Sequence, residues 1–179
     1  MNDNHNEYEL TRNIIALSGT RNWDEAKLEW DLVNIFKQTQ SGKCLCGHAP
    51  ITEHCVLLNR KNGKTVIVGN VCVKKFLGLP ADKIFHAIER IEKDLTRSLN
   101  AETIDFAHKQ GWMNDREREF YFDTTHKKKT GYKNLLTPKQ LGLRVKINRK
   151  VLQCFHSAGT KMGWSNGTLP VLTTLQRPS

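Results

Sequence analysis

The chain has 179 residues, 38% of them hydrophobic and 26% charged, which is enough for one domain or for one domain with a small appended module. No apolar run approaches the roughly 18–20 residues that a membrane-spanning helix needs. The first ten residues are polar and acidic, unlike a secretory signal or a transit peptide. The sequence therefore argues against a membrane-spanning protein and predicts a cytosolic one.

The formal net charge of +10 is distributed unevenly along the chain. Residues 42–78 contain six Lys and Arg against one Asp or Glu, and residues 126–153 contain nine against none. The segments before and between these two blocks are acidic. Such blocks indicate basic surface patches that suit an anionic partner, the alternative being a solvated face without a partner.

The first periodic segment of the chain lies between residues 24 and 38. Its apolar residues recur at three- and four-residue steps, namely Ala26, Trp30, Val33 and Phe36. This spacing predicts an amphipathic helix from Asp24 to Gln38, with Asn22 as its cap. Residues 1–41 are therefore expected to form an N-terminal segment that carries one helix.

The next residues predict a β-hairpin followed by a short helix. Two β-rich runs, 55–58 and 65–68, flank Asn62-Gly63, a pair that tolerates the positive φ angles of a tight turn. Gly69-Asn70 then breaks the second strand, and a helix is expected from Val71 to Leu77, just before a glycine.

From Pro80 onward the pattern is helical. The first of these helices has a buried stripe formed by Ile84, Ala87, Ile88, Ile91 and Leu95. Asn100 and Asn114 are suited to cap a second and a third helix. A Lys- and Gly-containing loop is expected over residues 126–134.

The last helix is predicted to begin at Thr137. Pro138 then occupies the first turn and Gln140 stands three residues after the cap, which is the pattern of a capping box. The helix is expected to end near Phe155, and residues 157–179 are expected to form an irregular tail.

Four of the five cysteines fall within 29 positions, from Cys44 to Cys72. In a reducing compartment such clustering indicates metal binding rather than disulfides, while Cys154 is expected to be an inert buried thiol. Cys44 and Cys46 form a tight turn with Gly47, and Cys72 lies at the start of the predicted short helix. We expect these three thiols to hold one structural zinc ion.

The fourth zinc ligand is open between three residues. Cys55 is preferred, because thiolate is the better zinc donor and the residue begins the first predicted strand, and His48 and His54 are the alternatives. A turn, a hairpin and a ligand on a helix start follow one another as in a treble-clef zinc finger. No H-x-E or H-E-x-x-H element supplies a general base beside a zinc-bound water, which counts against a deaminase or a metalloprotease. We expect a binding protein rather than an enzyme.

Three segments carry a resemblance to a known kind of module. They are the run 44–51 (CLCGHAPI), Asn59 with Asn62-Gly63, and the run 68–76 (VGNVCVKKF), preceded by Leu28-Glu29-Trp30. Together they resemble a treble-clef-like zinc-finger module of uncharacterised phage, large-virus and mobile-element proteins. The resemblance covers about a third of the chain and implies a viral or plasmid-borne setting, hence the cytosol of a host cell.

Basic residues gather at two places in the expected structure. Those near the zinc module are Arg60, Lys61 and Lys64 at the hairpin tip, with Lys74 and Lys75 after the last ligand cysteine. Those near the last helix are Lys139, Lys146, Arg149 and Lys150 on one helical face, with Lys127, Lys128, Lys129 and Lys133 just before it. Leu141, Val145, Leu152 and Phe155 occupy the opposite face, which is expected to be needed for the core and so argues against membrane binding.

The sequence therefore predicts an α+β protein that is mostly α. An N-terminal segment (1–41), a zinc-binding β-hairpin module (42–79), a helical bundle (80–156) and an irregular tail (157–179) follow one another. The expected function is binding DNA or RNA through phosphate contacts made by the basic surfaces. The alternative is a protein–protein inhibitor or adaptor that binds an acidic host protein, such as a nucleic-acid enzyme or a defence factor.

Overall fold

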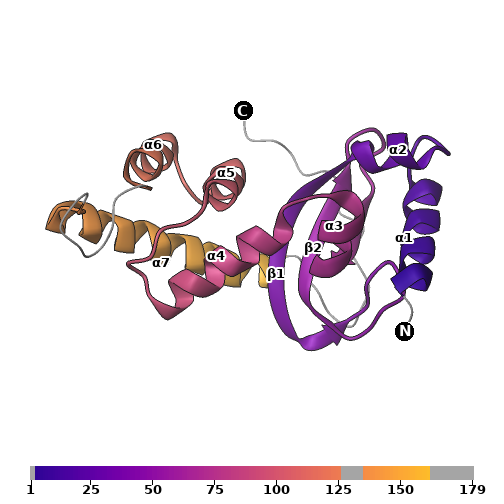
Figure 1. Ribbon diagram of the computed structural model, residues 1–179, viewed down its shortest axis with the longest axis horizontal. Helices are drawn as coiled ribbons and strands as arrows, with labels where there is room; N and C mark the ends of the chain where they lie inside the picture. Colours follow the sequence, from indigo (N-terminus) through magenta and orange to yellow (C-terminus); the bar gives the residue numbers. More distant parts are fainter. Residues whose placement is uncertain (1–2, 126–134, 162–179) are drawn as a thin grey trace. The chain divides into compact units, whose positions relative to one another are not determined.

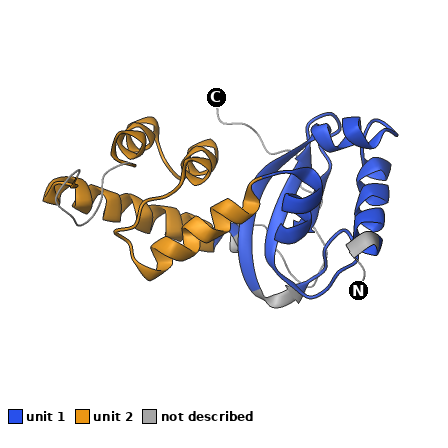
Figure 2. Ribbon diagram, in the orientation of Figure 1, with its two compact units in different colours: residues 1–79, 157–179 blue, residues 80–156 orange. Residues whose placement is uncertain are grey.

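The computed structural model describes residues 3–125 and 135–161 (Figure 1). Within them are seven α-helices and a three-stranded antiparallel sheet, so the expected mostly helical α+β class is confirmed. Contacts within the chain define two compact units, Pro80–His156 (unit 2) and the chain before and after it (unit 1) (Figure 2). No helix among the described residues is both long enough and apolar enough to cross a membrane.

Unit 1 is built on the sheet, whose strands lie in the order β1-β2-β3. The strands are β1 (Trp30–Gly42), β2 (Ile51–Asn59) and β3 (Thr65–Gly69). β2 and β3 form the predicted hairpin, and Gly63 in its turn has a φ of 73°, which glycine adopts without strain. Helix α3 (Asn70–Leu77) follows at once and ends at Gly78 in the left-handed conformation, as predicted.

The predicted helix from Asp24 to Gln38 is wrong. Asn22 does cap a helix, but this helix (α2, Trp23–Ala26) has four residues and continues as a 3-10 turn (Lys27–Glu29) before the chain becomes β1. A β-bulge explains the misleading spacing, because the register of β1 on β2 shifts between Leu32 and Asn34. The shift puts neighbouring apolar positions on the buried side, and the resulting pattern resembles a helical one.

An unpredicted helix, α1 (Asp3–Leu17), precedes these elements. Leu10 and Ile14 are its fully buried residues, and they lie one helical turn apart. α1 contacts α2 and α3 (Figure 1). The Asn13 amide also donates a 2.9 Å hydrogen bond to the Leu45 carbonyl, so α1 helps to fix the turn that carries the first cysteines.

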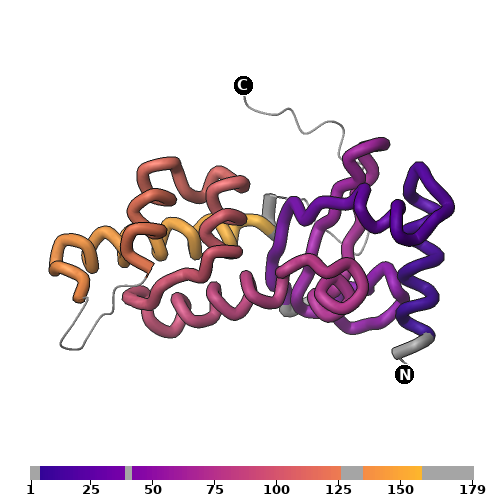
Figure 3. Tube along the Cα trace, turned by 45° about the horizontal axis from the view of Figure 1, so that its top comes forward, coloured from indigo at the N-terminus to yellow at the C-terminus, as the bar shows by residue number. Residues whose placement is uncertain are grey.

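Unit 2 contains α4 (Ala81–Lys93), α5 (Ala101–Lys109), α6 (Asp115–Thr124) and the greater part of α7 (Pro138–Lys161). Successive helices from α4 to α6 contact one another (Figure 3). Phe155 of α7 packs edge-on against Phe85 and Trp112, with ring centroids 6.2 and 6.5 Å away. These aromatic contacts form the centre of the unit 2 core.

The helix caps of unit 2 are confirmed. The side chains of Asn100 and Asn114 accept hydrogen bonds from the first turns of α5 and α6, and Asn114 forms a capping box with Glu117. Thr137 and Gln140 form the predicted box at the start of α7. Each cap satisfies backbone N–H groups that the helix itself leaves unpaired.

Helix α7 differs from the prediction at its end and on its buried face. It continues to Lys161 rather than ending near Phe155, so residues 157–161 are helical and not part of an irregular tail. The buried face also carries two polar residues, Arg144 and Asn148. Asn148 accepts a hydrogen bond from the Tyr121 hydroxyl and donates to two carbonyl oxygens before α5. The expected loop (126–134) and the rest of the tail (162–179) lie outside the described residues.

A buried carboxylate fixes the hairpin tip of unit 1. The Glu29 side chain is 1% exposed and pairs with the Lys61 ammonium at 2.9 Å. It also accepts 2.8 Å hydrogen bonds from the Gly19 N–H and the Asn59 amide. The Gly19 N–H, Lys61 and Asn59 all favour the charged form, and together they lower the pKa of Glu29 to about 2. We call Glu29, Asn59 and Lys61 the carboxylate clasp.

The clasp predicts acid sensitivity of unit 1. Since the folded-state pKa of Glu29 lies below its ordinary value near 4.5, its stabilising effect is complete above that pH and is lost as the pH falls from 4.5 toward 2. We expect Glu29→Gln to lower the melting temperature at pH 7 and to flatten its fall between pH 5 and pH 3, as measured by circular dichroism. Glu7→Gln, at an exposed position of α1, is the control and should keep the wild-type profile. If the melting temperatures of the wild type and of Glu29→Gln fell in parallel as the pH is lowered, Glu29 would not be the source of the acid sensitivity.

Candidate metal centre

The first two cysteines lie on a closed turn between β1 and β2. The Cys44 N–H donates to the His48 carbonyl at 2.9 Å, and the Gly47 N–H donates to the Cys44 carbonyl at 2.8 Å. Gly47 has a φ of 90°, which the reversal of the chain requires and which side chains with a Cβ rarely adopt. The turn is also attached to β3 by the Leu45 N–H, which donates to the Ile67 carbonyl at 3.1 Å. These bonds hold Cys44 and Cys46 in fixed positions.

The third cysteine comes from the other end of the hairpin. Cys72 lies in the first turn of α3, which follows β3 directly. Between them, the Gly69 N–H points at the Cys44 sulfur and donates to it at 3.2 Å. A backbone N–H that donates to a thiolate stabilises its negative charge. Sequence analysis missed this contact, because only the pairing of the strands brings Gly69 to Cys44.

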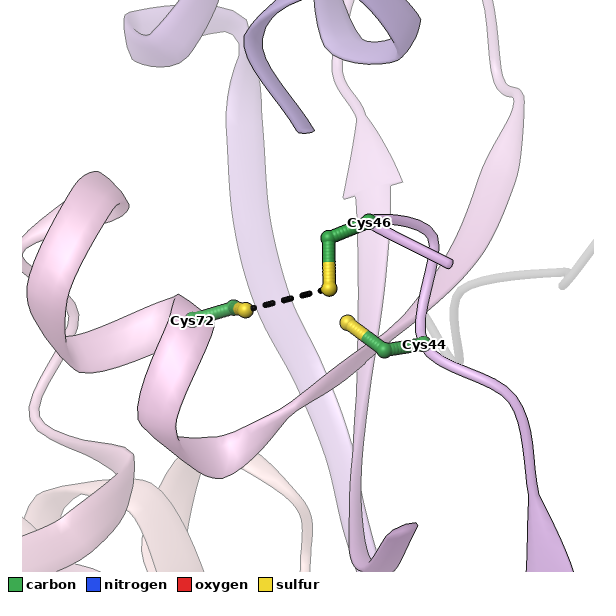
Figure 4. A group of neighbouring side chains, drawn as sticks. All are labelled: Cys44, Cys46 and Cys72. Carbon is green, nitrogen blue, oxygen red and sulfur yellow. Dashed lines mark hydrogen bonds between the residues drawn. The ribbon is translucent and has the colours of Figure 1, made fainter. Parts of the chain in front are cut away.

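The three sulfur atoms converge on one point (Figure 4). They lie within 4.8 Å of one another, and those of Cys46 and Cys72 are 3.5 Å apart. Three sulfurs held about 2.3 Å from one ion in tetrahedral directions lie about 3.8 Å apart, so the observed spacing suits a metal ion. The three side chains are 1–8% exposed and form no disulfide. We call Cys44, Cys46 and Cys72 the thiol cluster; it can hold a metal ion.

The thiols of the cluster differ in acidity. A hydrogen bond from Cys72, together with the Gly69 N–H, lowers the pKa of Cys44 to about 6 despite burial. The same pairing with Cys44 raises the pKa of Cys72, and burial raises that of Cys46. Cys44 is therefore the thiol of the cluster that ionises most readily, and a metal ion would displace protons from the other two.

Cys55, the preferred fourth ligand, does not join the thiol cluster. β2 begins at Ile51 rather than at Cys55, so the residue lies four positions into the strand, roughly 13 Å from its start. It pairs there with Ile35 of β1 and Val68 of β3, in the middle of the sheet. Its side chain is fully buried, and this burial raises the pKa of its thiol. Cys55 is therefore a core residue in this fold.

The two histidines that sequence analysis left open have different surroundings. His54 is buried, its ring stacks on Phe36 at 4.8 Å between centroids, and its Nδ1 lies 3.1 Å from the Thr52 carbonyl. His48 is exposed and lies in the wall of a cavity of about 420 Å³ to which Cys44 and Cys72 also contribute. Neither imidazole is within the distance that unites the three sulfurs.

The predicted phosphate-binding residues differ in exposure and in ion pairing. Arg60 and Lys61 at the hairpin tip pair with Asp31 and Glu29, and Lys150 pairs with Glu117 at 2.7 Å. Arg60 and Lys61 are nevertheless exposed, with side-chain exposures of 59% and 64%. The other exposed residues of the set are Lys64, Lys74, Lys75, Lys139, Lys146 and Arg149. Lys127, Lys128, Lys129 and Lys133 lie outside the described residues. At the hairpin tip Arg60 and Lys61 are thus paired with carboxylates, while α7 exposes Lys139, Lys146 and Arg149.

No protein-family model, curated protein or solved structure matches this chain. Its function has to be inferred from the thiol cluster, the cavity beside it and the charged helix faces.

The thiol cluster predicts metal-dependent stability of unit 1. We expect the protein, purified without a metal-affinity step, to carry about one equivalent of metal, and Cys46→Ser or Cys72→Ser to reduce this below about half. Both variants should melt at lower temperature and should no longer respond to chelators, because metal binding and folding are coupled. Elemental analysis and thermal melts measure both effects. Cys55→Ala should keep its metal, and a Cys72→Ser protein with full metal content would contradict the assignment.

Proposed function

We propose that the protein is a zinc-stabilised nucleic-acid-binding protein of phage or mobile-element type that acts in the cytosol of a host cell. The thiol cluster would hold one structural zinc ion within a treble-clef-like module. The exposed basic face of α7 would contact phosphates. The exposed cations of this face are the observation that carries the proposal.

The choice of zinc follows from the donors. Three thiolates suit a soft or borderline cation, and zinc in reduced thiolate sites is the ion that adds no redox chemistry. The order of turn, hairpin and ligand at a helix start supports the treble-clef comparison. An ion that links the two ends of the hairpin would add its binding free energy to the folding of unit 1.

The phosphate-binding surface is centred on α7. This helix contains Lys and Arg at six positions and no Asp or Glu. Lys139, Lys146 and Arg149 are exposed on one face, and the first and last of them lie ten residues apart, about 15 Å along the helix. The opposite face, including Val151 and Phe155, is buried in unit 2. A rigid helix with cations along its outer face suits several phosphates at once, which gives affinity without sequence preference.

The hairpin tip, in unit 1, is the less suitable place for phosphate contacts. Arg60 and Lys61 already pair with Asp31 and Glu29, so a phosphate would compete with these carboxylates for them. Lys64 is exposed and adds one cation there. We therefore expect α7 to dominate binding.

The proposal predicts a specific change in salt dependence. Replacing Lys139, Lys146 and Arg149 together by Gln removes three phosphate contacts, so the slope of log K against log salt should become shallower by about 2.7 for duplex DNA or about 2.1 for a single strand. Affinity at low salt should fall at least tenfold, as measured by fluorescence anisotropy with an oligonucleotide of mixed sequence.

A matched triple variant separates the helix face from net charge. Lys93→Gln, Lys109→Gln and Arg116→Gln remove the same charge from exposed positions on α4, on α5 and on α6. This variant should keep the wild-type slope. Equal losses in the two triple variants would show that only net charge matters. No wild-type binding at low salt, with an acidic protein retained during purification, would favour the adaptor alternative instead.

A further inference from the structure

The cavity beside the thiol cluster is where the coordination of a bound ion would be completed. Its wall comes from the first-cysteine turn, the start of β2 and the start of α3, with Asn6 of α1 at the edge. Cys44 and Cys72 belong to this wall, and Cys46 does not. Zinc in a structural site takes four ligands, so an ion held by the three sulfurs has one position left. The cavity is the space next to the cluster where a fourth donor can enter.

The other donors near this space are held elsewhere. Cys55 lies in the middle of the sheet, and the His54 ring is stacked on Phe36. The Glu53 carboxylate faces the cavity, but it accepts a 2.8 Å hydrogen bond from the Asn70 amide and lies 3.4 Å from the Lys37 ammonium. A carboxylate ligand would also make the net charge of a zinc trithiolate more negative, from −1 to −2, whereas a neutral imidazole would leave it at −1.

We propose that His48 is the fourth ligand, which gives a Cys3His centre made of Cys44, Cys46, His48 and Cys72. The backbone of His48 is already fixed against Cys44, because its carbonyl accepts the Cys44 N–H at 2.9 Å. Its side chain is exposed in the wall of the cavity that Cys44 and Cys72 also line, and coordination would require its ring to turn toward the cluster. Cys44, Cys46 and His48 then alternate along one turn, with Gly47 supplying the reversal.

This inference rests on the proposed metal centre and does not depend on nucleic-acid binding. The test uses the full chain loaded with cobalt(II), whose visible spectrum reports the number of thiolates and the geometry. X-ray absorption of the zinc form of the wild type is the second measurement. It should fit three sulfurs at about 2.3 Å and one nitrogen at about 2.0 Å.

Two substitutions at the same position give opposite expectations. His48→Ala should weaken metal binding more than about tenfold and change the cobalt ligand-field bands, as water replaces the imidazole. His48→Cys should restore tight binding and strengthen the thiolate-to-cobalt charge-transfer band, because a fourth sulfur coordinates. His86→Ala, which removes an exposed imidazole from α4, is the control and should leave the spectrum unchanged.

The possible failures are distinguishable. If wild type binds cobalt through three sulfurs and both His48 variants keep its spectrum, His48 is not a ligand and the inference is wrong while the metal centre stands. If the wild type binds neither cobalt nor zinc, the metal centre itself is wrong, and the inference falls with it. Loss of nucleic-acid binding by the α7 triple variant, or its persistence, bears on neither result.

Discussion

The meeting of three sulfur atoms at one end of the β2–β3 hairpin governs how unit 1 is built. Two sulfurs come from the turn before the hairpin and one from the helix after it, so any element that moves either end separates them. Asn13 of α1 and Ile67 of β3 hold the turn, and Gly69 donates directly to the Cys44 sulfur. Helix α1, the sheet and α3 thus share one point of attachment. A metal ion there would add its binding free energy to the folding of all of them.

The hairpin is also fixed at its opposite end. There the carboxylate clasp joins Glu29 to Asn59 and Lys61, and Glu29 reaches back to the Gly19 N–H after α1. A buried carboxylate is costly unless it is paired and hydrogen-bonded, and Glu29 meets both conditions. The carboxylate clasp and the thiol cluster thus place strong polar interactions at the two ends of the hairpin. The cations of the tip therefore serve the fold first. Lys139, Lys146 and Arg149, the exposed cations of α7 in unit 2, belong to neither attachment.

What the sequence predicted correctly was encoded by neighbouring residues. The Asn62-Gly63 turn, the glycine after α3 and the three asparagine and threonine caps of unit 2 each act within a few residues, so their signals survive in the sequence. The triplet Cys44, Cys46 and Cys72 was also predictable from clustering. β1 was not, because the bulge after Leu32 imitates a helical repeat and only pairing with β2 reveals the strand. Cys55 was misplaced for a related reason, since the start of β2 depends on its partners rather than on its own residues.

The position of the hairpin turn between the cysteines has a consequence for a nicked chain. Cys46 and Cys72 are 26 positions apart. A cross-link that closes a loop of this length lowers the conformational entropy of the unfolded chain, which stabilises the folded state by roughly 3.5 kcal/mol. A protease that cuts at the exposed Asn62-Gly63 would sever the backbone inside this loop. The two fragments would still be joined by the sheet and by a bound ion. They would co-purify until a chelator removed the ion. In this part of the molecule, a break in the backbone would therefore not by itself unfold the protein.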